Sequence, residues 1–205
     1  MFKILVLIPS RLSAKRLPGK PLLKINGLSI ISHVFKKAIE ANIGDVYVAT
    51  ENKEIVEEVE KNNGKAILTS NKHKTGSDRI YECYEKLNLK NINYIINLQG
   101  DEPNIEIDDL RHLKKLIKQY RPDIGTLAAK INDENKLNNE SIVKVITKKT
   151  ITRKNFPVAL DFKRKINKVG KNIFHHIGIY AYKPDILKKI ISFKQTNQEL
   201  KNKLE

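Results

Sequence analysis

The chain has 205 residues and carries 39 Lys and Arg against 23 Asp and Glu, which gives a formal net charge of +16. This length is enough for one large domain with its own hydrophobic core. No apolar run reaches the roughly 18 residues of a membrane span, the apolar start lacks a secretory cleavage pattern, and a single cysteine, Cys83, excludes an intramolecular disulfide. We therefore expect a cytoplasmic protein with no membrane segment.

The positive charge does not by itself predict a nucleic-acid partner. The chain contains 32 Lys and only 7 Arg, and they are spread along its whole length. Recognition of bases and phosphates favours the planar guanidinium of Arg, whereas scattered Lys is typical of a solvated surface. We therefore expect no nucleic-acid partner. The alternative, a basic nucleic-acid-binding protein, predicts a salt-sensitive affinity for DNA or RNA.

The first 120 residues alternate short apolar runs with segments whose apolar residues recur at helical spacing. Short apolar runs predict buried strands, and helical spacing predicts amphipathic helices. We expect strands at 3–8, 45–50, 65–69 and 93–98, and helices at 29–41, 53–61, 77–87 and 107–120. This alternation predicts an α/β fold in which a mostly parallel sheet is flanked by helices on both faces.

The second half changes character. We expect strands at 124–130, 141–148 and 173–182, a helix that begins at 183–185 and a further helix at 198–205. No internal repeat and no low-complexity linker divides the chain. The sequence therefore predicts one α/β domain with an irregular, β-rich second half.

Three polar clusters lie where predicted strands end or a predicted helix begins, and we expect them to converge, because ligands of parallel sheets bind beyond the carboxyl ends of the strands. The first, 9–21, holds two Arg and two Lys together with Gly19. Such cations suit a triphosphate or a pyrophosphate. The loop has neither the GxGxxG nor the P-loop pattern, which excludes those two nucleotide folds. The alternative interpretation is an ordinary basic surface loop.

The other two clusters are 97–103 and 75–79. In the first of these, Gly100 beside Asp101 at the end of a strand lets the carboxylate reach a metal ion on a substrate phosphate; the alternative is a simple loop and helix cap. In 75–79, Asp78 is typical of the start of a helix. The presence of Arg79 indicates a functional role, because a positive charge in the first turn is repelled by the positive end of the helix dipole.

Together these clusters resemble those of a known enzyme family. The matching stretches are IPSRLSAKRLPGKPL (8–22), TGSDRI (75–80), NLQGDEP (97–103) and HHIGIYAY (175–182). Their order and spacing, over essentially the whole chain, resemble the bacterial 3-deoxy-D-manno-octulosonate (KDO) cytidylyltransferases, or CMP-KDO synthetases. The resemblance implies a nucleotide-diphospho-sugar transferase-like, Rossmann-like fold. It also implies transfer of CMP from CTP to the anomeric hydroxyl of KDO, with release of pyrophosphate, for lipopolysaccharide synthesis.

The resemblance also implies roles for individual residues. Arg11 and Lys20 would hold the triphosphate of CTP, with support from Ser13 and Arg16, and Asp101 would bind Mg²⁺. Arg11, Lys20 and Asp101 would be the catalytic residues, and Gln99 would contact both nucleotide and sugar. The residues implied at the sugar acid are Arg79, Gln99, Arg153, His176, Tyr180 and Glu205. Without the resemblance, His176 is an ordinary buried strand histidine.

Residues 1–205 are accordingly expected to form a single nucleotidyltransferase domain that acts as a homodimer. Residues 1–122 would be its nucleotide-binding half, and 123–205 its sugar-binding and dimerisation half. Family members continue beyond the position of Glu205, through a Val-Asp-Thr-Pro-like motif whose Asp is a second metal ligand. We therefore expect a truncated chain with an incomplete metal site. Two alternatives remain: a nucleotide-binding remnant without activity, and a cytidylyltransferase for another sugar acid such as sialic acid.

Overall fold

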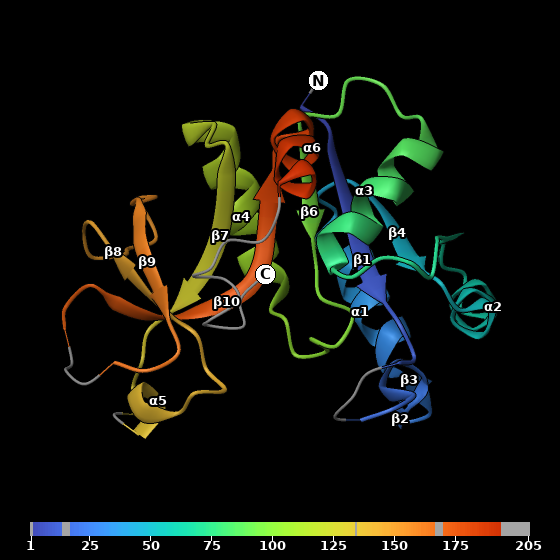
Figure 1. The fold of residues 1–205 in the computed structure, drawn as a ribbon, viewed down its shortest axis with the longest axis horizontal. Helices are drawn as coiled ribbons and strands as arrows, with labels where there is room; N and C mark the ends of the chain where they lie inside the picture. The colour runs from blue at the N-terminus through green and yellow to red at the C-terminus, as the bar shows by residue number, and fades with distance from the viewer. Residues whose placement is uncertain (1, 14–16, 134, 167–169, 194–205) are drawn as a thin grey trace.

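Strand β1 (Ile4–Ser10) lies within an eight-stranded sheet that has helices against both faces (Figure 1). The computed structural model describes residues 2–13, 17–133, 135–166 and 170–193. Within these ranges, the other strands of the sheet are β4 (Asp45–Thr50), β5 (Ala66–Leu68), β6 (Tyr94–Asn97), β7 (Ile124–Ala129), β8 (Lys144–Thr147), β9 (Ala159–Lys163) and β10 (Ile173–Tyr182). The helices are α1 (Ile30–Ala41), α2 (Lys53–Lys61), α3 (Gly76–Leu87), α4 (Ile107–Tyr120), α5 (Asn135–Asn138) and α6 (Pro184–Ser192). A 3-10 turn, η1 (Lys20–Leu22), precedes a small hairpin of β2 (Lys24–Ile25) and β3 (Leu28–Ser29).

The strands β5, β4, β1 and β6 are neighbours in that order and run parallel. Helices connect them, with α1 between β1 and β4, α2 between β4 and β5, and α3 between β5 and β6. The predicted α/β fold with a mostly parallel sheet is therefore confirmed. Because the four strands are parallel, their carboxyl ends meet at one edge of the sheet.

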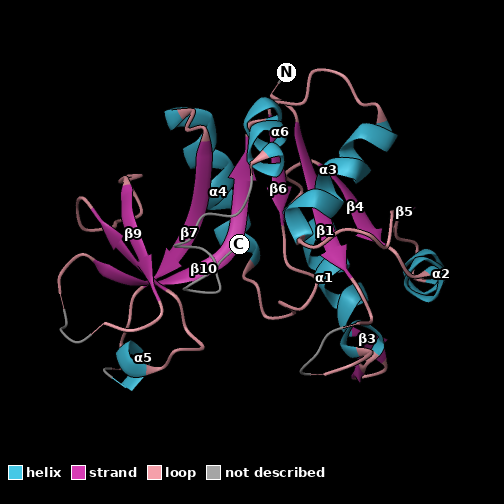
Figure 2. Cartoon of the chain, in the orientation of Figure 1, coloured by secondary structure: helices cyan, strands magenta, loops and turns pink. Residues whose placement is uncertain are grey.

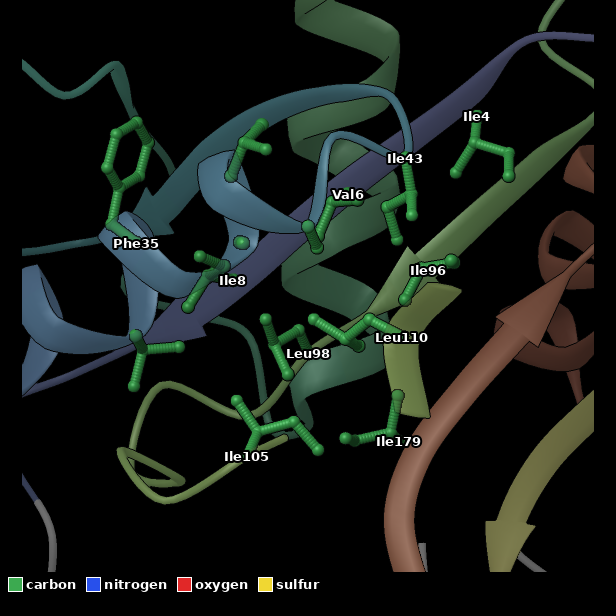
Figure 3. Packing of buried hydrophobic residues seen from close by; sticks show 14 of the residues in the cluster. Ile4, Val6, Ile8, Phe35, Ile43, Ile96, Leu98, Ile105, Leu110 and Ile179 are labelled. Atoms are coloured by element: carbon green, nitrogen blue, oxygen red, sulfur yellow. The ribbon is translucent and has the colours of Figure 1, made fainter. Parts of the chain in front are cut away.

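Hydrophobic packing divides the helices between the two faces of the sheet. The larger cluster lies against α1, α2 and α4, and Figure 3 shows Val6 and Ile8 of β1 there with Phe35 of α1. The smaller cluster places Leu5 and Leu7 of the same strand against α3 and α6. Both faces of β1 are thus covered, which is why its sequence is a continuous apolar run rather than an alternating one.

Local signals explain where the helices begin. The side chain of Ser29 accepts the backbone N–H of Ser32 at the start of α1, and Thr75 and Asp78 form a reciprocal capping box at the start of α3. Cys83 of α3 is buried, and burial raises the pKa of its thiol to about 12, as expected of a core thiol. None of the helices in the described part of the chain is long and apolar enough to cross a membrane.

Strand β10 joins the parallel sheet to the β-rich half. Its residues 180–182 pair antiparallel with β6 and its residues 173–175 pair with β8, while β7 runs along the other side of the strand. A register shift between Ile177 and Tyr180 separates these two portions, and Figure 2 shows β10 curving from the side of β9 toward β6. One long strand therefore belongs to both halves of the molecule.

The sequence analysis did not predict β9 or the hairpin of β2 and β3. Strand β9 ends the order of the sheet, and its residues Ala159 and Leu160 are exposed, so it lacks the alternating burial that marks a strand in a sequence. The helix predicted at 198–205 lies outside the described residues. The single domain and its division at 122 stay predictions.

Lys144 of β8 is fully buried, contrary to the expectation that lysines form the solvated surface. Its ammonium group donates to the carbonyl oxygens of Asn139 at 2.7 Å, Ile142 at 2.9 Å and Arg164 at 2.5 Å. Burial lowers its pKa from the usual value for lysine. These three hydrogen bonds use all the donors of the ammonium group and hold a loop to the end of β9.

Candidate active site

A cavity of about 220 Å³ lies at the carboxyl edge of the parallel strands. Its lining comes from all three polar clusters and consists of Pro9, Ser10, Arg11, Lys20, Pro21, Thr75, Gly76, Arg79, Gln99, Gly100 and Asp101. The expected convergence of the clusters is therefore confirmed.

Lys20 and Asp101 meet across this cavity. The Lys20 Nζ atom donates to Asp101 Oδ2 at 2.8 Å, and the two side chains are 32% and 53% exposed. Gly19 turns the chain toward η1 with a φ of +70°, which a residue with a side chain adopts with strain. A pair this exposed is weak, so both charges remain available to a ligand. Arg11, also exposed, adds a second cation to the same wall.

The close approach of Gly100 places Asp101 at the cavity. A Cβ atom on Gly100 would lie 2.8 Å from the carbonyl oxygen of Pro9, so the turn after β6 can pass this near to β1 only with glycine. Among the described residues, no three His, Cys, Asp or Glu side chains gather closely enough to hold a metal ion. One exposed carboxylate suits Mg²⁺ that is shared with substrate phosphates, since Mg²⁺ commonly takes only one or two protein carboxylates.

Arg79 lines the cavity but is buried, with its side chain 3% exposed. Its Nη2 atom pairs with the carboxylate of Glu51, and its Nη1 atom donates to Thr69 Oγ1 at 2.7 Å and to the carbonyl oxygen of Ser70 at 3.3 Å. The pair with Glu51 explains how a cation is stable in the first turn of a helix. Contact between Arg79 and the sugar acid stays a prediction.

A second carboxylate, Glu82 of α3, holds the loop that leads to the cavity. It accepts the backbone N–H of Ser70 at 2.9 Å and the Lys86 ammonium at 2.8 Å, and it also pairs with the His73 ring. Burial opposes its ionisation, but the hydrogen bonds from Lys86, His73 and Ser70 lower its pKa to about 2. Glu82 is therefore charged at neutral pH and fixes the loop that ends at Thr75.

Gln99 connects the cavity to a larger groove. It lines both, and a Cβ atom on Gly178 of β10 would lie 3.9 Å from Gln99 Cγ. The groove has a volume of about 1970 Å³ and is formed largely by β7, β8, β9, β10 and the segment 150–158. Arg153, His176 and Tyr180 line it too, so the structure brings most of the residues implied at the sugar acid to one surface.

His176 is 9% exposed and is held by its neighbours in the groove. Its Nε2 atom lies 2.9 Å from the hydroxyl oxygen of Thr126, which in turn lies 2.8 Å from the carbonyl oxygen of Ile179. The threonine donates to that carbonyl, so His176 donates from Nε2. The rings of Phe162 and Tyr180 pack against the imidazole. Burial, with a smaller effect of His175, lowers the pKa of His176 to about 4, and the ring is neutral at pH 7.

Some site residues fall elsewhere or were not found from the sequence. Ser13 is exposed on the basic loop, while Arg16 and Glu205 lie outside the described residues. Sequence reasoning missed Glu51, Glu82 and Thr126, because their partners lie far away in the chain. Only the Glu82-Lys86 pair, at helical spacing, was visible as a local signal.

Comparisons with known proteins agree with this geometry. A family model described as cytidylyltransferase matches residues 5–205. The 3-deoxy-manno-octulosonate cytidylyltransferase of Rhodopseudomonas palustris (strain BisB5) is 41% identical over 203 residues, which cover 98% of this chain and 82% of that protein. The protein of the same name from Bradyrhizobium sp. (strain BTAi1 / ATCC BAA-1182) is 42% identical over 205 residues, which cover 99% and 82%.

Solved structures show the same fold. CMP:2-keto-3-deoxy-manno-octonic acid synthetase complexed with CTP superposes with a TM-score of 0.85 at 34% identity, over 98% of this chain and 83% of that one. A cytidylyltransferase from Leptospira borgpetersenii, at 18% identity and a TM-score of 0.62 over 97% of this chain and 68% of that one, shares the fold. The fold and the cavity at its carboxyl edge define a nucleotidyltransferase. More particularly, the chain belongs to the cytidylyltransferase family, which confirms the resemblance seen in the sequence.

Replacing Glu82 by Gln should loosen the loop beside the cavity. The amide still accepts the Ser70 N–H but carries no charge for His73 and Lys86, so we expect the free energy of unfolding at pH 7 to fall by about 1–3 kcal/mol. Urea unfolding measures this loss, and the exposed Glu57→Gln on α2 is the matched control. Equal stability of the two variants would contradict the role of Glu82.

The neutral state of His176 predicts a pH dependence of stability. An unfolded histidine takes up a proton near pH 6.5, whereas folded His176 does so only near pH 4, so the folded state loses stability as the pH falls between these values. The loss should reach about 3 kcal/mol. The free energy of unfolding of the wild type, measured in urea between about pH 7 and pH 4, should decline more steeply than that of His176→Gln. Parallel curves would contradict the assignment.

Proposed function

We propose that this chain transfers CMP from CTP to the anomeric hydroxyl of KDO and releases pyrophosphate. The observation that carries the proposal is the junction at Gln99, where the basic cavity meets the groove that contains His176. Relatives named as KDO cytidylyltransferases, at 38 to 42% identity over nearly the whole chain, support the choice of substrates.

Arg11 and Lys20 supply the charge that a triphosphate requires. Attack of a sugar hydroxyl on the α-phosphate needs alignment of the reacting groups and compensation of negative charge more than covalent help from the protein. The Lys20 ammonium group has three donors and uses one of them on Asp101, at 2.8 Å, so it can also bind a phosphate oxygen. The carboxylate of Asp101 is 53% exposed and is open to a ligand as well.

We propose that Asp101 holds Mg²⁺ together with the phosphates of the nucleotide. When bound, the ion would lower the charge of the α-phosphate and the pKa of the attacking hydroxyl. In this structure the protein contributes one exposed carboxylate on a rigid turn, which is the donor set expected for an ion that the substrate brings.

The groove suits a sugar acid because its lining offers cations, Arg153 among them, beside several neutral groups. Arg153 is exposed there and is free to pair with a carboxylate. His176 is neutral, and Tyr180 beside it presents a hydroxyl group, so both suit hydrogen bonds with sugar hydroxyls. As part of the same proposal, the product serves lipopolysaccharide synthesis in the cytoplasm.

We further propose that two copies of the chain associate through the β-rich half. Strand β9 is at the edge of the sheet. Val158, just before this strand, and Leu160, within it, are 64% and 62% exposed. Exposed apolar side chains on an edge strand are normally covered, and a second copy of the same edge would cover them.

The reaction is tested by pyrophosphate release from CTP, Mg²⁺ and KDO. We expect release by the wild type and a loss of roughly 100-fold or more in Asp101→Asn, because charge compensation at the reacting phosphate is lost. Asp45→Asn, an exposed carboxylate at the start of β4, is the matched control and should remain active. Pyrophosphate release no greater than in a heat-inactivated sample would overturn the proposal. Faster release with sialic acid than with KDO would show that sialic acid is the substrate.

Dimerisation is tested by sedimentation velocity. The wild type should sediment as a dimer, and Leu160→Glu should shift it toward the monomer, because the charge would be buried against the other copy. Lys61→Glu, an exposed residue of α2 at the other end of the sheet, serves as the charge control. A wild type that sediments as a monomer would contradict this part of the proposal.

A further inference from the structure

Ser10 ends strand β1 with a hydroxyl group that has no hydrogen-bond partner in the described part of the protein. The residue is 6% exposed, and its Oγ atom is the one buried side-chain nitrogen or oxygen without a hydrogen-bond partner among the residues that the structure describes. Buried polar groups are almost always hydrogen-bonded, because an unsatisfied one costs free energy in the folded state. The exception at Ser10 therefore requires a physical reason.

The position of Ser10 supplies that reason. The residue lies in the wall of the 220 Å³ cavity, directly before Arg11 and near the turn that carries Asp101. Other buried serines of the chain have partners: the Ser29 hydroxyl donates to Ser32 Oγ at 2.8 Å, away from the cavity lining. The residue with this hydroxyl thus lines the proposed nucleotide site, and because its Oγ atom is itself buried, a ligand reaches it after a rotation about the side-chain torsion.

The chemistry of the cavity wall indicates which part of the nucleotide bonds to Ser10. Arg11 and Lys20 are the cations of the wall that reach solvent, and they suit the charged phosphates. Ser10 is buried and carries no charge, so it adds a directional hydrogen bond and no charge compensation. The cavity is also smaller than the roughly 300–1,000 Å³ of pockets that enclose a drug-sized ligand, so it holds a part of the nucleotide rather than the whole.

We infer that the Ser10 hydroxyl hydrogen-bonds the uncharged nucleoside part, base or ribose, of the nucleotide bound in this cavity. The inference rests on the proposed function, which supplies the nucleotide, and adds to it a residue that recognises the nucleoside. In the free protein none of the described residues provides a partner for this hydroxyl. It gains its hydrogen bond on binding, with only a rotation about its side-chain torsion.

This arrangement predicts opposite effects of Ser10→Ala on binding and on stability. We expect the Kd for CTP to rise roughly 3- to 10-fold, the range for one neutral hydrogen bond. The melting temperature of the free protein should stay the same or rise, because the substitution removes an unsatisfied polar atom. The Kd for inorganic triphosphate should not change. Isothermal titration without KDO measures both affinities, and thermal unfolding measures stability.

Ser32→Ala is the matched control, since it removes a buried serine hydroxyl that has a partner. It should lower the melting temperature and leave the Kd for CTP unchanged. An unchanged Kd for CTP in Ser10→Ala would overturn the inference, as would an equal loss of affinity for triphosphate. A lower melting temperature without a change in Kd would show a structural hydroxyl, bonded to buried water, and would overturn it too. Pyrophosphate release by the wild type tests the proposed function separately.

Discussion

The burial of β1 on both faces is the constraint on which the site depends. Its residues from Ile4 to Ile8 are at most 2% exposed, so the strand can neither shift its register nor turn over without exposing one of the two hydrophobic clusters. The first residues that can carry polar chemistry are Ser10, at its carboxyl end, and Arg11, directly after it. The parallel neighbour β6 ends at the same edge and delivers Gln99 and Asp101 opposite them. The hydrophobic core therefore fixes the position of the cavity.

Ion pairs around the cavity divide into two kinds according to their exposure. Arg79 and Glu51 are 3% and 14% exposed, and loss of either partner would leave a buried charge unpaired. They stabilise the wall. Lys20 and Asp101 are 32% and 53% exposed, so water already screens their attraction and a ligand exchanges for it at small cost. The buried ion pair thus stabilises the protein, whereas the exposed ion pair leaves its charges available to a ligand.

The sequence predicted what local patterns determine. The helices at 53–61 and 107–120 and the strand at 45–50 agree with the structure at both ends, because hydrophobic periodicity and apolar runs mark them directly. It did not predict the burial of Lys144, whose carbonyl partners include Arg164, 20 residues away. Nor did it predict the pair of Glu51 with Arg79, 28 residues apart. Such partners meet only after the chain has folded, and a composition rich in lysine gives no sign of which cation is buried.

Strand β10 makes the two halves of the molecule one site. Its 180–182 portion pairs with β6, the strand that leads to Gln99, and its 173–175 portion pairs with β8. The Thr126 hydroxyl bonds to the Ile179 carbonyl within the register shift between these portions and to His176 beside it. The distance between nucleotide and sugar is therefore set by backbone hydrogen bonds and not by a flexible linker. Alignment of two substrates for direct attack needs this rigidity, since small displacements of reacting atoms are costly. In the proposed site, buried neutral groups such as His176 and Ser10 would position the substrates, and exposed cations would balance their charge.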